Sequence, residues 1–110
     1  MGRSDYLGEF EQMVLLSVLR LGDEAYGVSI HDELGRTTGR EAKRGAVYVA
    51  LERLAAKGYV TSHYGDPSAE RGGRAKRFYT VEPAGRAALR ASRDALMHLW
   101  NGIEPELEER

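Results

Sequence analysis

The segment AKRGAVYVALERLAAKGYV, residues 42–60, has the pattern of one amphipathic helix that ends at a glycine. Val47, Leu51 and Leu54 recur at spacings of four and three, which places them on one helical face. Gly58 stands where a helix commonly ends. The opposite face carries Arg44, Gly45, Tyr48, Val49 and Glu52. We therefore predict a helix that buries one face and exposes a face that is first basic and small, then aromatic.

Lys43 and Arg44 lie at the start of this predicted helix, where positive charge opposes the helix dipole. The first N–H groups of a helix favour a nearby anion, so these cations make sense if a phosphate or a base edge binds there. The contacts with DNA predicted for this helix come from Lys43, Arg44, Gly45, Tyr48 and Val49. The plain alternatives are a core position for Tyr48 and solvated surface positions for the two cations.

Downstream of this helix, the sequence predicts a β-hairpin with a long basic tip. Residues 59–64 and 76–81 are rich in aromatic and β-branched residues, which favours strands. The turn-rich segment GDPSAERGGRA, residues 65–75, connects them. We call this hairpin with its basic tip the wing. Contacts with DNA are predicted from its residues Arg74, Lys76 and Arg77. Because Lys76 and Arg77 are adjacent on a strand, only one of them is expected to point at DNA.

Helical patterns lie on both sides of this central unit. Residues 6–21 predict a first helix whose buried face holds Phe10, Met13, Val14, Ser17, Val18 and Leu21. Leu15, Leu16 and Leu19 add apolar surface on its other side, which a partner subunit could cover. Residues 26–34 predict a second helix that Gly35 ends. Pro83 opens a last helix that ends near Asn101, and the tail EPELEER is expected to fray.

This order predicts an α+β, mostly α fold: a winged helix-turn-helix of three helices and a β-hairpin, followed by a C-terminal dimerisation helix. We divide the chain into a DNA-binding domain at residues 1–82 and a dimerisation helix with its tail at residues 83–110. In such a fold the third helix enters the DNA major groove, and the hairpin wing reaches along the phosphate backbone or into the minor groove.

Charge along the chain favours the same interpretation. The chain has 110 residues and a formal net charge of −1. Residues 36–77 hold ten basic and four acidic side chains, a balance of +6, and the remainder carries −7. A basic middle between acidic ends suggests a polyanion site, although a merely solvated surface is the alternative. With no cysteine and no apolar run of membrane length, we expect a cytoplasmic protein without membrane association.

Catalytic chemistry finds little support in the sequence. His31, His63 and His98 are scattered and show no metal-ligand spacing. Neither a nucleophile motif nor a phosphate-binding loop occurs. We predict a protein that is not an enzyme and has neither cofactor nor metal.

The C-terminal helix carries an apolar stripe that needs a partner. Leu89, Leu96 and Ile103 repeat at seven residues, and Leu99 and Trp100 thicken the stripe. The predicted homodimer interface consists of Leu15, Leu89, Leu96, Leu99, Trp100 and Ile103. Trp100 is either a packed anchor of this interface or a wall of a ligand pocket between subunits.

Several spaced motifs resemble those of PadR-type winged-helix transcriptional regulators, and the match covers roughly residues 7–100. They are G-A-V-Y-x-x-L-x-R-L-x-x-K-G-Y-V at 45–60, R-G-G-R-A-K-R-F-Y-x-V at 71–81, G-R-A-A-L at 85–89, and Y-G-V-S-I at 26–30. The length is similar to that of the short subgroup with a single C-terminal helix. The sequence departs from the family pattern at Val47 (leucine in the family), at Val49 (proline) and at Glu82-Pro83 (Thr-Glu).

The resemblance implies a sequence-specific regulator that acts on double-stranded DNA as a homodimer, as a repressor on a pseudo-palindromic operator. It also permits release by a small aromatic effector bound beside Trp100. The alternative is a winged-helix protein-interaction module that does not bind DNA. The operator sequence, the regulated genes and the effector are not readable from the sequence.

Overall fold

The computed structural model describes residues 6–66 and 75–108 of the chain. Along the sequence its elements are α1 (Glu9–Leu21), η2 (Gly22–Glu24), α2 (Gly27–Thr38), α3 (Arg44–Ala56), β1 (Val60–Tyr64), β2 (Arg77–Val81), α4 (Pro83–Trp100) and η5 (Glu104–Leu107). Here η marks a short 3-10 helix. The order confirms the predicted succession of helices, hairpin and C-terminal helix.

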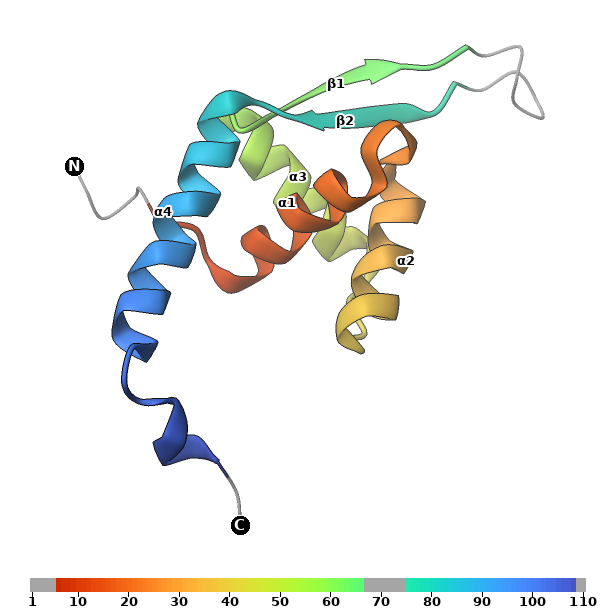
Figure 1. Cartoon of the computed structure of the whole chain (residues 1–110). Coiled ribbons are helices and arrows are strands. Elements are labelled where there is room, and N and C mark those ends of the chain that lie inside the picture. The colour runs from red at the N-terminus through yellow and green to blue at the C-terminus, as the bar shows by residue number, and fades with distance from the viewer. Residues whose placement is uncertain (1–5, 67–74, 109–110) are drawn as a thin grey trace.

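Helices α1, α2 and α3 pack around one core, with the hairpin lying across one end of them (Figure 1). Helix α1 is central because it contacts α2, α3, β2 and α4. The largest fully buried side chains are Leu15, Ile30, Leu34, Leu51, Leu54, Val14, Val47 and Val60. Helix α4 runs down the edge of the molecule, and its C-terminal part extends past the body (Figure 1).

The hairpin is an antiparallel pair whose register runs from Val60 opposite Val81 to Tyr64 opposite Arg77. Side chains alternate between the faces of a strand, so Tyr79 and Val81 are buried while Thr80 between them is exposed. The backbone N–H of Tyr79 donates to the Ala25 carbonyl at 2.8 Å. A β-bridge also joins the next residue, Tyr26, to Phe78. The segment before α2 therefore anchors the base of the wing.

The predicted helix ends need two corrections. Gly35 does not end α2, because the helix continues to Thr38 and Gly39 ends it in a left-handed conformation with φ 77°. An interior glycine weakens a helix without breaking it, whereas positive φ is the conformation that glycine adopts at little cost. The C-terminal tail also holds more structure than expected, since residues 104–107 form η5. The start of α4 at Pro83 and its end before Asn101 agree with the sequence.

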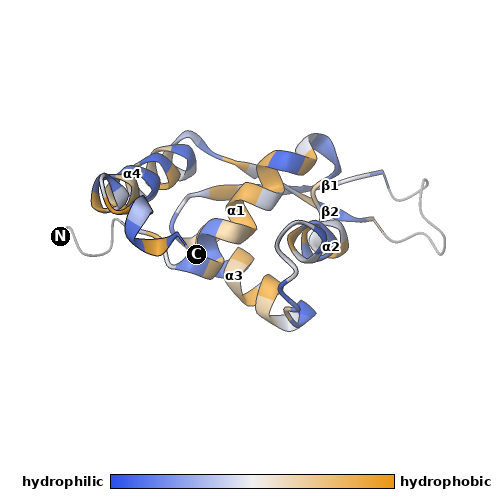
Figure 2. Ribbon diagram, turned by 60° about the horizontal axis from the view of Figure 1, so that its bottom comes forward, coloured by the Kyte–Doolittle hydropathy of each residue, from blue (hydrophilic) through white to orange (hydrophobic). Residues whose placement is uncertain are grey.

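Leu15 lies in the core of one chain and not at the predicted homodimer interface. It is fully buried within one chain, because α1 is covered on several sides at once, whereas its neighbour Leu16 is 48% exposed. Figure 2 shows apolar positions on α4 at the edge of the molecule as well as on α1 and α3.

None of the helices in the described residues is long and apolar enough to cross a lipid bilayer. The division of the chain after residue 82 into two domains stays a prediction.

Candidate nucleic-acid interface

Helix α3 has one face in the core and one in solvent, as its sequence pattern predicts. Its buried positions are Val47, Ala50, Leu51 and Leu54, each at most 3% exposed. On the other side Tyr48 is 45% and Val49 is 52% exposed, and Arg44, Gly45 and Glu52 are exposed as well. An exposed valine on a helix surface suits contact with an apolar group such as the methyl of thymine.

The charges of the basic middle region divide into two groups in the structure. Arg36, Arg40 and Lys57 form ion pairs with carboxylates of α1 and α2, namely those of Glu33, Glu9 and Glu11. By contrast, within residues 6–66 and 75–108, no ion pair involves Lys43, Arg44 or Arg53 of the α3 region. In the described part of this basic middle region, the cations without a carboxylate partner therefore lie on and beside α3.

The first turn of α3 is open to an incoming partner. Lys43 is its N-cap residue and makes no side-chain cap. Ala46 and Val47 donate their backbone N–H groups to the Lys43 carbonyl. A Cβ added at Gly45 would meet nothing within 4 Å, so packing within the chain does not require glycine there. Exposed backbone N–H groups at a helix start, with two cations beside them, form a site that suits an anion.

His31 fixes the turn that leads into α3, a role that the sequence reading missed. Its Nε2 lies 2.8 Å from the Ala42 carbonyl, and its Nδ1 lies 3.0 Å from Oδ1 of Asp32. A carbonyl can only accept, so Nε2 carries a proton and donates it. His31 thus ties α2 to the residue immediately before Lys43. No sequence signal distinguishes such a histidine from an ordinary surface one.

Tyr48 packs against the start of α2 and is also partly exposed to solvent. Its hydroxyl lies so close to Gly27 at the start of α2 that a methyl group there would collide with it. Gly27 is buried, whereas Tyr48 remains 45% exposed. The glycine of the Tyr-Gly-Val-Ser-Ile motif is therefore explained by close approach of the α3 tyrosine. Tyr48 orients α3 against α2 and still presents part of its ring to solvent.

Arg77 connects the wing to α3. Its Nε donates to Ser62 Oγ at 2.9 Å, and one of its terminal nitrogens lies 3.5 Å from a Glu52 carboxylate oxygen. Its guanidinium also lies 5.4 Å from the ring centre of Tyr79. Burial raises the pKa of that tyrosine, and the nearby Arg77 charge opposes the rise. Arg77 therefore holds the base of the wing next to the exposed face of α3.

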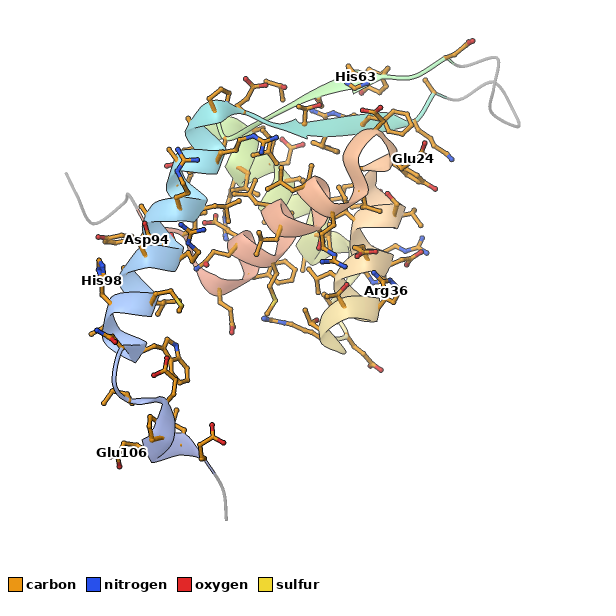
Figure 3. The ribbon with its side chains drawn as sticks, viewed as in Figure 1. Glu24, Arg36, His63, Asp94, His98 and Glu106 are labelled. Atoms are coloured by element: carbon orange, nitrogen blue, oxygen red, sulfur yellow. The ribbon has the colours of Figure 1, made fainter. Side chains whose placement is uncertain are left out.

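Lys76, the residue before Arg77, contacts the aromatic ring of Tyr26. Its Nζ lies 4.3 Å from the ring centre of Tyr26, and that ring meets Phe78 edge-on at 5.6 Å. His63 stacks on the same phenylalanine, on the outer side of the hairpin (Figure 3). Arg74, the third predicted wing contact, lies outside the described residues. The roles of these side chains in DNA binding stay predictions.

Glu33 is a second positioning residue that the sequence did not reveal. Its carboxylate accepts from Arg20 on α1 at 2.7 Å, and from Arg36 and Thr37 on α2 at 2.6 and 3.1 Å. Hydrogen bonds from Arg36 and Arg20 lower the pKa of Glu33 from 4.5 to about 2. The Glu33 carboxylate thus connects α1 to α2 on a side of α2 that faces solvent.

In the described part of the chain, no cluster of three or more histidine and acidic side chains could hold a metal ion.

A separate surface lies along α4. A groove of about 430 Å³ between α1 and α4 is lined by Gln12, Leu16, Leu19, Arg86, Leu89, Arg90, Arg93, Leu96, Met97 and Trp100. Of the predicted interface residues, Leu96, Leu99, Trp100 and Ile103 are 40–75% exposed, while Leu89 is buried at the groove's base. Because Leu15 is buried, α1 contributes Leu16 to this surface instead.

Comparison with known proteins identifies relatives of this chain. The model of the transcriptional regulator PadR-like family matches residues 15–91. The transcriptional regulator Rv3488 of Mycobacterium tuberculosis (strain ATCC 25618 / H37Rv) is 39% identical over 77 residues, which make up 70% of this chain and 67% of that protein.

Solved structures show the same fold. A PadR family transcription regulator from hypervirulent Clostridium difficile R20291 has a TM-score of 0.69 at 21% identity, covering 90% of this chain and 99% of that one. Bacillus subtilis PadR in complex with operator DNA has a TM-score of 0.62 at 22% identity, covering 76% of this chain and 47% of that one. These likenesses confirm the predicted winged-helix architecture.

Proposed function

The chain belongs to the PadR-like family of transcriptional regulators, and on that premise we propose that it binds double-stranded DNA through α3 and the wing. A family of regulators agrees with the prediction that the chain is not an enzyme. The B. subtilis relative of the same fold is known in complex with operator DNA, which supports duplex DNA as the ligand class.

The observation that carries the proposal is the exposed start of α3. Lys43 and Arg44 have no carboxylate partner among the described residues, and Gly45 beside them leaves the backbone accessible. A cation that the fold leaves uncompensated next to free helix N–H groups attracts phosphate. Arginine also recognises guanine through its O6 and N7 atoms in the major groove. Either contact would suit an exposed arginine such as Arg44.

The proposed regulator is a homodimer and a repressor. The apolar residues exposed along α4 support self-association, because monomers rarely expose a contiguous patch of this kind. Two copies related by a two-fold axis would present two α3 helices to a pseudo-palindromic operator, with half-sites about 34 Å apart. The groove between α1 and α4, with Trp100 in its wall, would accept a small aromatic effector that releases the operator.

The test is binding to a duplex from the protein's own promoter region, measured by fluorescence anisotropy at several salt concentrations. A dimer that contacts six or more phosphates should lose affinity by about three orders of magnitude between 50 and 200 mM salt. Affinity that does not change with salt, or no binding at all, would contradict the proposal and favour a winged-helix module that binds protein instead.

A footprint on the bound promoter would test the dimer, which should protect two related half-sites. Protection of one asymmetric site would contradict the two-fold arrangement. Transcription in vitro from the same promoter should fall when the protein is added. A rise would identify an activator.

A further inference from the structure

The exposed face of α3 contains one side chain whose charge is opposite to that of the cations around it. Among residues 44–56, all of which the structure describes, Glu52 is the single acidic residue. Its side chain is 68% exposed. It follows Tyr48 by four residues and Val49 by three, so it shares their side of the helix. The motif at residues 45–60 specifies no residue type at position 52, so the glutamate is a feature of this sequence and not of the motif.

The stability of the fold does not account for Glu52. Among the described residues its carboxylate forms an ion pair with Arg77 at 3.5 Å, and an exposed pair of this kind is worth little. Glu52 also lies too far from the first turn of α3 to be stabilised there by the helix dipole. A negative charge on this face would weaken the attraction of a polyanion unless it makes a specific contact of its own.

The wing holds the Glu52 carboxylate in a defined place. Arg77 is itself fixed by the hydrogen bond from its Nε to Ser62 Oγ and by the ring of Tyr79. Its guanidinium contacts Oε2 of Glu52, whereas within residues 6–66 and 75–108 the other oxygen, Oε1, accepts no hydrogen bond. The carboxylate is therefore positioned through one oxygen, and the other is available to a donor from outside the chain. The nearby guanidinium charge also reduces the repulsion between this carboxylate and phosphate.

We propose that Glu52 is a specificity-determining residue that accepts a hydrogen bond from the N4 amino group of a cytosine in the DNA major groove. The proposal rests on the DNA binding through α3 proposed above, and it names a base that this chain selects. A phosphate is not a partner for Glu52, because two like charges in contact cost free energy. The contact must therefore be made with a base edge.

The donors and acceptors of the major groove select cytosine among the four bases. A carboxylate only accepts hydrogen bonds, and the groove offers amino groups on cytosine and on adenine. Adenine carries the acceptor N7 beside its amino group, and that atom repels a carboxylate, whereas cytosine presents the amino group alone. Guanine and thymine present acceptors but no donor on this edge. Glu52 should therefore favour cytosine first and disfavour guanine and thymine.

Glu52 reaches a base pair different from the one that Arg44 reaches. Eight residues separate the two, which is about 12 Å along the helix axis at about 1.5 Å per residue. At about 3.4 Å per base pair, this distance corresponds to about three steps of the duplex. The preference for cytosine is therefore expected as a separate signal in the binding site, about three base pairs from the position that Arg44 contacts.

The first experiment selects binding sites from a library of random duplexes with the full-length protein, and fluorescence anisotropy then measures single-base variants of the best site. The wild type should prefer cytosine at one position by about tenfold. Glu52→Ala should lose this preference, keep the others, and bind random duplex more tightly because a negative charge is gone. Glu52→Gln should move the preference towards adenine, because the glutamine amide pairs with both N6 and N7.

Two control variants accompany these changes. Glu106→Gln removes the same charge from η5, at the end of the molecule away from the hairpin, and should select the same sites as the wild type (Figure 3). Arg77→Ala removes the cation that positions Glu52, and should weaken binding to all duplexes by a similar factor. Both Glu52 variants should melt like the wild type, because the side chain they replace is exposed.

A Glu52→Ala variant that still selects cytosine at the same position would overturn the proposal. So would a Glu52→Ala variant that weakens binding to every duplex equally, as expected for Arg77→Ala, because Glu52 would then act only by holding the wing. In either case, a wild type that binds its promoter with the expected salt dependence would leave the proposed function standing. A wild type that binds no duplex at any salt concentration would overturn the proposed function and this inference together.

Discussion

Helices α3 and α4 each bury one face and expose the other, but the exposed faces differ in kind. The exposed face of α3 begins with Lys43, Arg44 and Gly45, and most of its apolar residues point into the core. The exposed face of α4 carries large apolar side chains, among them Leu99 and Trp100. The first surface suits a hydrated polyanion, whereas the second suits a dry contact with protein.

The contrast shows that exposure alone does not identify a binding site. Uncompensated cations on a rigid helix attract phosphate over a distance and lose their effect in salt. Exposed leucine and tryptophan side chains stabilise a complex only when a complementary surface covers them and excludes water. The two faces should therefore respond oppositely to salt and to truncation, which the following changes test.

The largest effect is expected for Trp100→Ala. If the tryptophan is buried between subunits, its removal should cost about 3–5 kcal/mol of dimer stability, the range of large core truncations. Sedimentation measures this loss. Emission from the sole tryptophan should be blue-shifted in the wild-type dimer.

His98→Ala is the matched control for that change, because the histidine lies on the same helix and points away from the groove (Figure 3). It should leave the dimer intact. A monomeric wild type with water-like tryptophan emission would show that α4 does not form the interface. Saturable, stoichiometric quenching by a planar aromatic dye would add the effector pocket to the role of Trp100.

A smaller effect is expected on the α3 face. Arg44→Ala should weaken operator binding by about 1–3 kcal/mol if Arg44 pairs with guanine, and should weaken binding to random DNA less. Arg74→Ala, in the segment for which the sequence predicts the tip of the wing, should weaken both duplexes alike and lower the salt slope by about 1. Identical behaviour of the two variants on both duplexes would show that α3 and the wing do not divide reading and positioning between them.

The smallest effect is expected for Glu33→Gln, which touches neither face. The pKa of Glu33 is about 2 in the folded chain against an ordinary 4.5, so its ionised form stabilises the fold at and above pH 4.5. That contribution is lost as the pH falls from about 4.5 to 2. The melting temperature of the variant should therefore depend less on pH in this window. An unchanged pH dependence would show that the contacts with Arg20 and Arg36 add no stability.

Much of this arrangement could be predicted from the sequence because it follows from local patterns. The spacing of Val47, Leu51 and Leu54 gives the buried face of α3, and Pro83 gives the start of α4. The strands followed from their residue types, within one residue at each start. The exposure of Arg44 and Tyr48 also followed from helical periodicity alone.

The remaining features depend on contacts between distant segments. Gly35 and Gly39 look alike in the sequence, and only the fold shows that the second takes positive φ. Leu15 is buried because β2 and α4 join α2 and α3 around α1, which one stripe of periodicity does not encode. Glu33, His31 and Gly27 each contact a residue that is distant in the sequence, namely Arg20, Ala42 and Tyr48, and their residue types carry no signal of those partners.

The hydrogen bond from His31 bears on how readily such a protein can change its operator. His31 holds a main-chain carbonyl, that of Ala42, so the turn into α3 does not depend on which side chains follow it. Residues 43–45 can then vary without loosening the turn. If residues 43–45 contact DNA as proposed, substitutions there would change operator preference while the fold stays constant. A library randomised at residues 43–45 should keep wild-type melting behaviour in most members, whereas most replacements of His31 should lower it.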